Sequence, residues 1–279
     1  MSANPTFEQA FVTEVTTDRP AEQAKLLPPV STAGSVGFGR LFAVEVRKLT
    51  NTVTGRVMLG VIALLTLAVA TVTIVMFDGF GATTWLDNLS KVGFGVNLLL
   101  PILGILLATQ EWTQRTALTT FALEPRRGRV LLAKLLVVVG VAITAFAVLV
   151  AVTIASFAIG ASINNVPITW TPDWAILGGA LAVLLLNTVM ATGFGMLLMN
   201  TPAAIVLFMG LPTLMPLVSM ISEDVAKLMM WIDPNRTWGP LMGGTMDADA
   251  AAKLAVSAAI WIVLPLTVGI IRQLRREVK

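Results

Sequence analysis

The chain of 279 residues contains no cysteine, no histidine and no tyrosine. The absence of cysteine excludes disulfide bonds and thiol chemistry. The absence of histidine excludes metal sites built on imidazole and any mechanism that needs a histidine general base. Carboxylates remain available, so these absences narrow the possible chemistry without excluding all of it.

Charged residues are also scarce, at 13% of the chain, against roughly 25% in ordinary soluble domains. Hydrophobic residues make up 56% and the mean hydropathy is +0.83, which indicates an integral membrane protein. The net charge of +3 and the pI near 9.6 are also compatible with nucleic-acid binding. However, the basic residues lie beside apolar stretches rather than on a soluble domain, so we predict no nucleic-acid partner.

Six apolar windows are long enough for a helix of about 20 residues to cross a bilayer core of about 30 Å. They are residues 57–77, 92–109, 135–159, 174–199, 203–221 and 254–271. The fourth and fifth windows are separated only by residues 200–202, and Pro202 cannot continue the preceding helix. The sequence therefore predicts an all-α polytopic membrane protein with six spans and a tight turn between spans four and five.

The distribution of lysine and arginine predicts how these spans are oriented. With the N-terminus inside, fifteen of the 19 basic residues fall in inner segments, and only Lys91, Lys227, Arg236 and Lys253 fall in outer ones. Cytoplasmic loops of membrane proteins carry this excess of positive charge. We therefore expect both termini in the cytoplasm, including a short C-terminal tail at residues 272–279.

Two segments precede the first span. Residues 1–35 are polar and contain prolines, which predicts a disordered cytoplasmic tail or a small docking segment that orders on a partner. In residues 36–56, apolar side chains recur at steps of three and four, which predicts an amphipathic helix on the inner leaflet with its cations near lipid phosphates. A cytosolic extension of the first span is the alternative.

The last outer segment, residues 222–253, is apolar and aromatic but is interrupted by Pro234 and Pro240. It predicts short interfacial or re-entrant helices with Trp231 and Trp238 at headgroup depth, although an ordered loop is also possible. Asp233 before Pro234 is typical of a turn.

The six windows lack Asp, Glu, Lys, Arg and His, whereas ion-driven transporters usually keep an ionisable residue in mid-membrane. The polar candidates for a substrate pathway are Asn97, Asn187 and Thr188, although such residues often bond a neighbouring helix instead. The chain also has no phosphate-binding G-x-x-x-x-G-K-[ST] run. Energy for any transport must therefore come from a partner, which predicts a chain with no cofactor of its own.

The connection EWTQRTALTTFALEPRRGRVLLAK, residues 111–134, holds seven charged residues. Residues 110–123 contain neither proline nor glycine and predict a helix that Pro125 ends, followed by a turn through Arg129. Lys134 is expected to bind lipid phosphates. The excess of positive charge expected on inner loops explains neither the length of this connection nor the presence of Glu111 and Glu124. We therefore interpret the connection as a docking surface.

This connection resembles the inner loop of ABC-2 type transporter permeases, especially those of actinobacterial type. The matching residues are Glu111, Arg115, Thr116, Leu118, Pro125, Arg127, Leu132 and Lys134, with Glu45, Arg47, Lys48 and Leu49 before the first span. The six-span layout and the long outer segment are similar too, so the resemblance covers residues 36–279.

The resemblance implies a permease subunit of the bacterial plasma membrane, with no enzyme activity of its own. It implies two permease subunits, the same or homologous, and two copies of a separate ATPase that binds the ATP. It also implies a coupling helix in the inner loop and a connecting helix before the first span. The implied coupling residues are Glu111, Arg115, Phe121, Glu124, Arg126 and Arg127, and those of the connecting helix are Arg40, Glu45, Arg47 and Lys48.

The function implied is ATP-driven export of a hydrophobic or amphipathic substrate. A non-transporting membrane anchor or assembly protein, whose inner loop recruits a cytoplasmic partner, is the main alternative. A lipid-modifying enzyme that uses Asp233, Asp247 and Asp249 is a further one.

Overall fold

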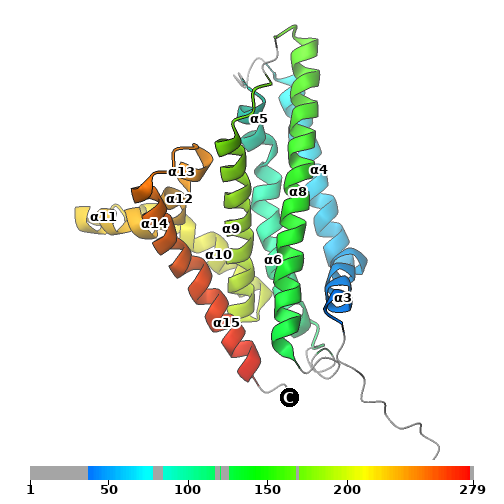
Figure 1. The fold of residues 1–279 in the computed structure, drawn as a ribbon, viewed down its shortest axis with the longest axis vertical. Coiled ribbons are helices and arrows are strands. Elements are labelled where there is room, and N and C mark those ends of the chain that lie inside the picture. Colours follow the sequence, from blue (N-terminus) through cyan, green and yellow to red (C-terminus); the bar gives the residue numbers. More distant parts are fainter. Residues whose placement is uncertain (1–36, 78–83, 117–119, 121–125, 168–169, 277–279) are drawn as a thin grey trace, which may run out of the picture. The chain divides into compact units, whose positions relative to one another are not determined.

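The computed structural model describes residues 37–77, 84–116, 120, 126–167 and 170–276. All regular structure in these residues is helical, and the residues from Phe38 onward form one compact unit. Figure 1 shows its longest helices running side by side. The predicted all-α class is confirmed for this part of the chain.

Among the described residues, six helical segments are long and apolar enough to cross a membrane, which is the architecture of a multi-pass membrane protein. They are α4 (Val53–Val75), α6 (Phe94–Thr113), α8 (Arg127–Ile163), α9 (Trp174–Leu198), α10 (Thr201–Val218) and Ala248–Arg275. The last consists of α14 (Ala248–Ala258), a π-helical turn η1 (Ala259–Val263) and α15 (Leu264–Arg275). The third and last segments extend beyond their apolar windows at both ends, because polar residues there continue the same helical turns. By contrast, α4, α9 and α10 end one to three residues before their windows do.

The centre of this unit is the packing of α6 against α9, and small residues bring the two backbones together. A Cβ added at Gly195 would lie 2.8 Å from the Cβ of Ala108, and one added at Gly104 would lie 2.5 Å from the Thr192 hydroxyl oxygen. Small residues at helix interfaces allow such close approach in membranes. Gly195, the last residue of the GFG run at 193–195, therefore has a packing role in α9.

The turn between α9 and α10 is as short as the sequence predicts. Met199 adopts a left-handed conformation with a φ of 52° and ends α9. Asn200 then caps α10, its side-chain oxygen accepting from the Ala203 amide at 3.0 Å. Pro202 lies in the first turn of α10, where a missing N–H costs no helical hydrogen bond.

Three short helices, α11 (Glu223–Ile232), α12 (Pro234–Thr237) and α13 (Gly239–Met242), lie between α10 and α14. In Figure 1, α11 lies across the direction of the long helices. Trp261 and Ser257 both donate to the carbonyl of Ile232, at 2.7 and 3.3 Å, and so join α11 to the last span. Asn235 donates to the Pro212 carbonyl of α10 at 3.0 Å, because Pro216 has no N–H to fill that position.

The two tryptophans of this segment lie in different environments. Trp231 is 40% exposed, whereas Trp238 is only 4% exposed. Trp238 packs with Phe194 and Phe208 in a core cluster, so its ring faces the protein interior, and headgroup depth stays a prediction for both residues. The short helix α13 folds back onto α9, and Leu241 lies so close to Gly179 that no Cβ fits there.

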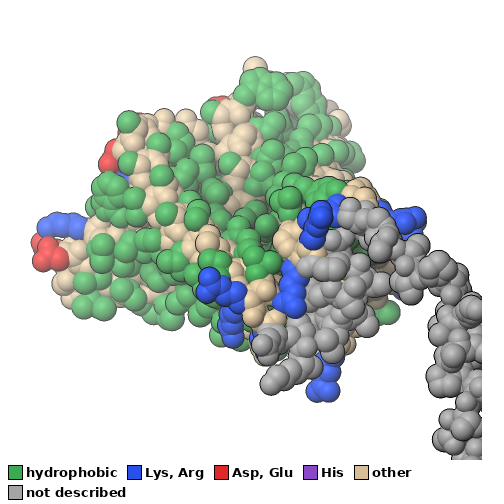
Figure 2. Space-filling model, turned by 60° about the horizontal axis from the view of Figure 1, so that its bottom comes forward, with side chains coloured by type: hydrophobic (Ala, Val, Ile, Leu, Met, Phe, Trp, Pro, Cys, Tyr) green, Lys and Arg blue, Asp and Glu red, His purple; other side chains and the backbone are tan. Residues whose placement is uncertain are grey.

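The amphipathic segment before the first span forms α3 (Phe38–Asn51), and Thr52 caps the following α4. A further short helix, α5 (Trp85–Val92), begins with a capping box between Thr84 and Asp87. We use the name basic end for α3 together with the C-terminal ends of α6 and α15 and the N-terminal end of α8. Figure 2 shows lysine and arginine side chains gathered around this end.

Candidate functional site

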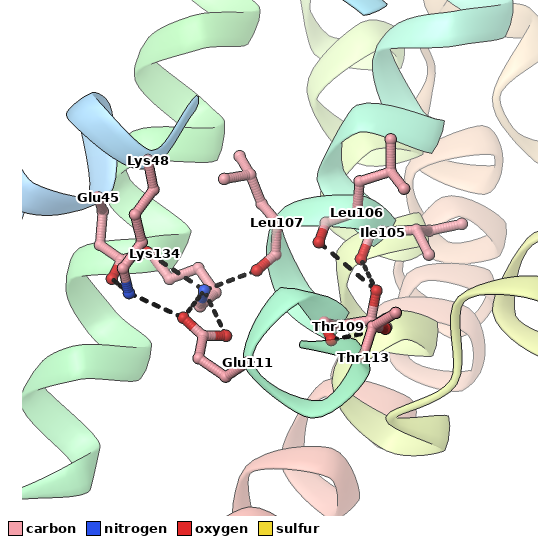
Figure 3. A network of polar contacts seen from close by, with 9 residues as sticks. All are labelled: Glu45, Lys48, Ile105, Leu106, Leu107, Thr109, Glu111, Thr113 and Lys134. Carbon is pink, nitrogen blue, oxygen red and sulfur yellow. Dashed lines mark hydrogen bonds and ion pairs between the residues drawn. The ribbon is translucent and has the colours of Figure 1, made fainter. Parts of the chain in front are cut away.

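Four charged side chains from three helices meet at the basic end, and we name them the ion cluster. Glu45 and Lys48 come from α3, Glu111 from the last turn of α6, and Lys134 from the first part of α8. Figure 3 shows all four pointing toward one another. Glu45 and Lys48 lie three residues apart on α3, so one face of that helix presents both of them.

Lys134 is the centre of the ion cluster. Its ammonium donates to both carboxylate oxygens of Glu111, at 2.9 and 3.0 Å, and to Oε2 of Glu45 at 3.1 Å. It also donates to the Leu107 carbonyl at 2.6 Å. The side chain is only 2% exposed. One lysine thus joins all three helices.

Lys48 completes the ion cluster from the α3 side. Its ammonium donates to Oε1 of Glu45 at 2.5 Å and to Oε1 of Glu111 at 2.9 Å. The ion cluster therefore contains two positive and two negative groups and is neutral as a unit. Buried charges are costly unless they are paired and hydrogen-bonded, and here each one is.

The position of Lys134 differs from the sequence expectation that it binds lipid phosphates. It lies seven residues into α8, about 10 Å along the helix from its start at 1.5 Å per residue. There its side chain faces α3 and α6 rather than lipid, because two buried carboxylates need its charge. The same pairing explains why Glu111 and Glu45 occur among apolar neighbours.

The electrostatics of Lys48 set a pH dependence. Burial lowers its pKa, but the nearby Glu111 and Glu45 carboxylates outweigh burial and raise the pKa above the ordinary value of 10.5. A group whose pKa is raised by folding stabilises the protein fully at pH values below its pKa in the unfolded chain. This stabilisation is lost as the pH rises through the pKa of the group in the folded state.

We therefore expect the stability difference between wild type and Lys48→Met to be constant from neutral pH to 10.5 and to shrink above it. Unfolding in detergent at a series of pH values measures it. A stability difference that already shrinks between neutral pH and 10.5 would contradict the raised pKa of Lys48.

Other basic side chains at this end cap helix C-termini, where the carbonyl groups carry partial negative charge. Arg127 at the start of α8 donates to the carbonyls of Gln273 and Arg276, at 3.1 and 2.7 Å. Arg272 donates to the Leu197 carbonyl at 2.7 Å. The Arg276 guanidinium lies 5.0 Å from the ring centre of Trp112. These contacts join α8 and α9 to α15.

Apart from Lys48, the predicted coupling and connecting residues fall into four groups. Arg40, Arg47, Arg115 and Arg126 are exposed. Arg127 is half-buried on the end of α15, whereas Glu45 and Glu111 face inward and do not belong to an exposed docking surface. Phe121 and Glu124 lie outside the described residues.

The boundaries of the connection also differ from the sequence prediction. Glu111 continues α6, which ends at Thr113, because no proline or glycine interrupts the helix between Ile105 and that point. Arg115 then takes a left-handed conformation with a φ of 56°. The predicted turn through Arg129 is wrong, because α8 already begins at Arg127 and Gly128 is accommodated in its first turn.

The three candidates for the substrate pathway are in different environments. Asn97 lines a cavity of about 190 Å³ between α5, α6, α8, α9 and α13, together with Asp87 and Ser90. Thr188 is buried against Gly104 and donates to the Leu184 carbonyl at 2.6 Å. Thr188 therefore belongs to helix packing, Asn187 is half-buried, and Asn97 is the one that faces a cavity.

Within the described ranges, no group of three or more acidic, histidine or cysteine side chains is placed to hold a metal ion. No protein-family model matches the chain, and no similar protein is found among curated sequences.

Proposed function

We propose that the protein is the membrane-spanning permease subunit of an ATP-driven transporter, with its basic end facing the cytoplasm. A separate ATPase docks on α3 and on the connection between α6 and α8, and two permease subunits, the same or homologous, work with two ATPases. The observation that carries the proposal is the ion cluster, which fixes α3 and both ends of this connection to the spans.

A docking surface that passes force to transmembrane helices has to move together with them. Lys134 bonds Glu111 at the end of α6 and Glu45 on α3, so these helices resist separation at this point. Arg127 ties the start of α8 to the end of the last span. Movement of a partner against α3 or the connection would therefore reach α6, α8 and α15 directly.

The exposed arginines at this end supply the contact with the partner. Since the ion cluster is neutral by itself, Arg115 and Arg126 keep their charge for an acidic surface on the ATPase. Complementary charges of this kind guide encounter and fix the register of docking. Arg40 and Arg47 add positive charge along α3.

The substrate is hydrophobic or amphipathic and the direction is export. The cavity beside Asn97 supports the substrate class, because its walls are mainly apolar and include Leu149, Ala180 and Leu184. Pro101 also lacks the N–H that would bond the Asn97 carbonyl within α6, which adds polarity at this point. A compound with an apolar body and a small polar group fits such a site.

The test is affinity purification of the full chain from its own membranes, followed by an assay of ATP hydrolysis in the preparation. We expect ATPase activity with wild type and a loss of at least about tenfold with Arg115→Glu plus Arg126→Glu. Like charges across an interface cost several kcal/mol, and each 1.4 kcal/mol corresponds to a factor of about ten. The matched control is Lys227→Glu on α11, an exposed charge reversal outside the basic end.

The proposal would be contradicted if the folded wild-type chain, purified from its own membranes, carried no ATPase with it. Capture of a partner without ATPase activity, again dependent on Arg115 and Arg126, would instead favour a membrane anchor that recruits a cytoplasmic protein.

A further inference from the structure

A long apolar groove runs between α4 and α8, with α3 at one end, and we name it the α4–α8 groove. Its volume is about 600 Å³. Its walls include Phe42, Val46 and Leu49 of α3, residues 59–67 of α4 and residues 137–152 of α8. We propose that the α4–α8 groove binds one acyl chain of an anionic phospholipid whose phosphate lies beside the arginines of α3.

The walls suit a hydrocarbon chain because no polar group in them requires a partner from a ligand. Three threonines line the groove, and each donates its hydroxyl to a carbonyl of its own helix. Thr50 bonds Val46 at 3.2 Å, Thr66 bonds Ile62 at 2.8 Å and Thr144 bonds Gly140 at 2.8 Å. A polar substrate group would find no free donor among these hydroxyls, whereas an acyl chain needs none.

The length of the groove also fits one lipid leaflet. Lining residues on α8 extend from Val137 to Val152, which is about 22 Å at 1.5 Å per residue. One leaflet contributes about 15 Å, half of the hydrocarbon thickness of a bilayer. An acyl chain that enters at the α3 end can therefore lie in the groove over its whole depth in that leaflet.

The charge at the α3 end selects the headgroup. Arg40 and Arg47 are exposed on α3, and Arg56 is exposed at the start of α4. The acidic residue of α3, Glu45, is already neutralised inside the ion cluster and does not offset these arginines. Each basic residue near an anionic lipid surface contributes about 1 kcal/mol, so an anionic phospholipid is favoured over a zwitterionic one.

Such a lipid would support α3 along the face that adjoins the ion cluster. Leu49 of α3 is buried and lines the groove, next to the partly buried Lys48. The acyl chain fills the space along Phe42, Val46 and Leu49, while the ion cluster holds the neighbouring face of the same helix through Glu45 and Lys48. This inference concerns lipid binding and holds whether or not an ATPase docks on the same end.

Gly140 allows the groove to be blocked without disturbing the backbone. It lines the groove, and a Cβ added there meets nothing within 4 Å. Gly140→Leu places a side chain in the path of the acyl chain, and Gly140→Ala makes the same backbone change without filling the groove. Gly178→Leu on α9 is the matched control, because a Cβ at this exposed glycine also meets nothing within 4 Å.

The experiment measures phospholipid retained by the purified full-length chain by mass spectrometry, then rebinding of phosphatidylglycerol and phosphatidylcholine from mixed micelles. We expect several-fold less retained lipid with Gly140→Leu and unchanged retention with Gly140→Ala and Gly178→Leu. Arg47→Gln should reduce the preference for phosphatidylglycerol. Inorganic phosphate should not displace the lipid, because the acyl chain holds it.

Equal retention in Gly140→Leu and Gly140→Ala would overturn the proposal. So would displacement by inorganic phosphate, which would make the site one for a free anion. A change of oligomeric state in Gly140→Leu with retained lipid unaltered would also overturn it, because the groove would then be an interface between two copies of the chain.

Discussion

Lys134→Met is expected to destabilise the protein by about 3–5 kcal/mol, because it leaves two buried carboxylates with too little positive charge. Glu45 would lose the hydrogen bond that its Oε2 accepts from Lys134, and Glu111 would keep only Lys48. Since Lys134 joins α3 to α6 and α8, the loss should appear as reduced stability in detergent and in lipid nanodiscs. The free energy of unfolding measured in either medium tests this prediction.

A charge-balanced variant separates the ion pairing from the packing of the lysine side chain. Glu45→Gln together with Lys134→Met leaves Lys48 and Glu111 as one neutral pair, still 2.9 Å apart. We expect the double variant to be more stable than the sum of the two single changes predicts, with a coupling of about 1–3 kcal/mol.

The matched control is Lys227→Met, which removes a lysine from an exposed pair with Asp224. Exposed pairs contribute at most about 1 kcal/mol, so this variant should remain close to wild type. Equal effects of Lys134→Met and Lys227→Met would show that the ion cluster does not hold α3 in place.

Gly195→Leu is expected to separate α6 from α9, with a cost of about 1–3 kcal/mol or more from overpacking. A Cβ at Gly195 already lies 2.8 Å from the Cβ of Ala108 and 3.2 Å from backbone atoms of Ile105. The backbone of α6 cannot move aside at Ile105 and Ala108 without disturbing Glu111, which lies less than two helical turns further along the same helix. We therefore expect both lower stability and weaker attachment of α3.

Gly210→Leu on α10 is the control for this substitution, because a Cβ there meets nothing within 4 Å. Thermal unfolding in the same detergent compares the two variants. If Gly195→Leu unfolded at the same temperature as Gly210→Leu, the close packing of α6 on α9 would not be a source of stability.

Much of the fold could be predicted from the sequence because its signals are local. A run of about 20 apolar residues predicts a span by its length and composition, and Asn200 before Pro202 predicts the short turn after α9. In each case the residues that carry the information are neighbours in the chain.

The ion cluster could not be predicted in this way. Lys48 and Glu111 are 63 residues apart, and Glu45 and Lys134 are 89 residues apart. Their charges next to apolar helices were visible, but each could equally have faced lipid phosphates or a partner. Only the packing of α3 across the ends of α6 and α8 determines that they pair with one another.

The ends of α8 and the position of Trp238 show the same limit. Helix propensity does not decide whether Gly128 begins a helix or continues a turn. In the structure, Gly128 lies in the first turn of α8. Trp238 is typical of a membrane interface by residue type, yet α13 folds back onto α9 and brings this ring into the core with Phe194.

The central claim is that the ion cluster fixes α3 to the spans, so that the proposed docking surface and the spans move as one body. Because the chain has no cysteine, spin labels can be placed only where wanted, at Arg47→Cys on α3 and Leu132→Cys on α8. The distance distribution between them, measured in nanodiscs, tests the claim most directly. It should be narrow in the otherwise unchanged chain and with Lys227→Met, and broad with Lys134→Met; an equally narrow distribution with Lys134→Met would contradict the claim.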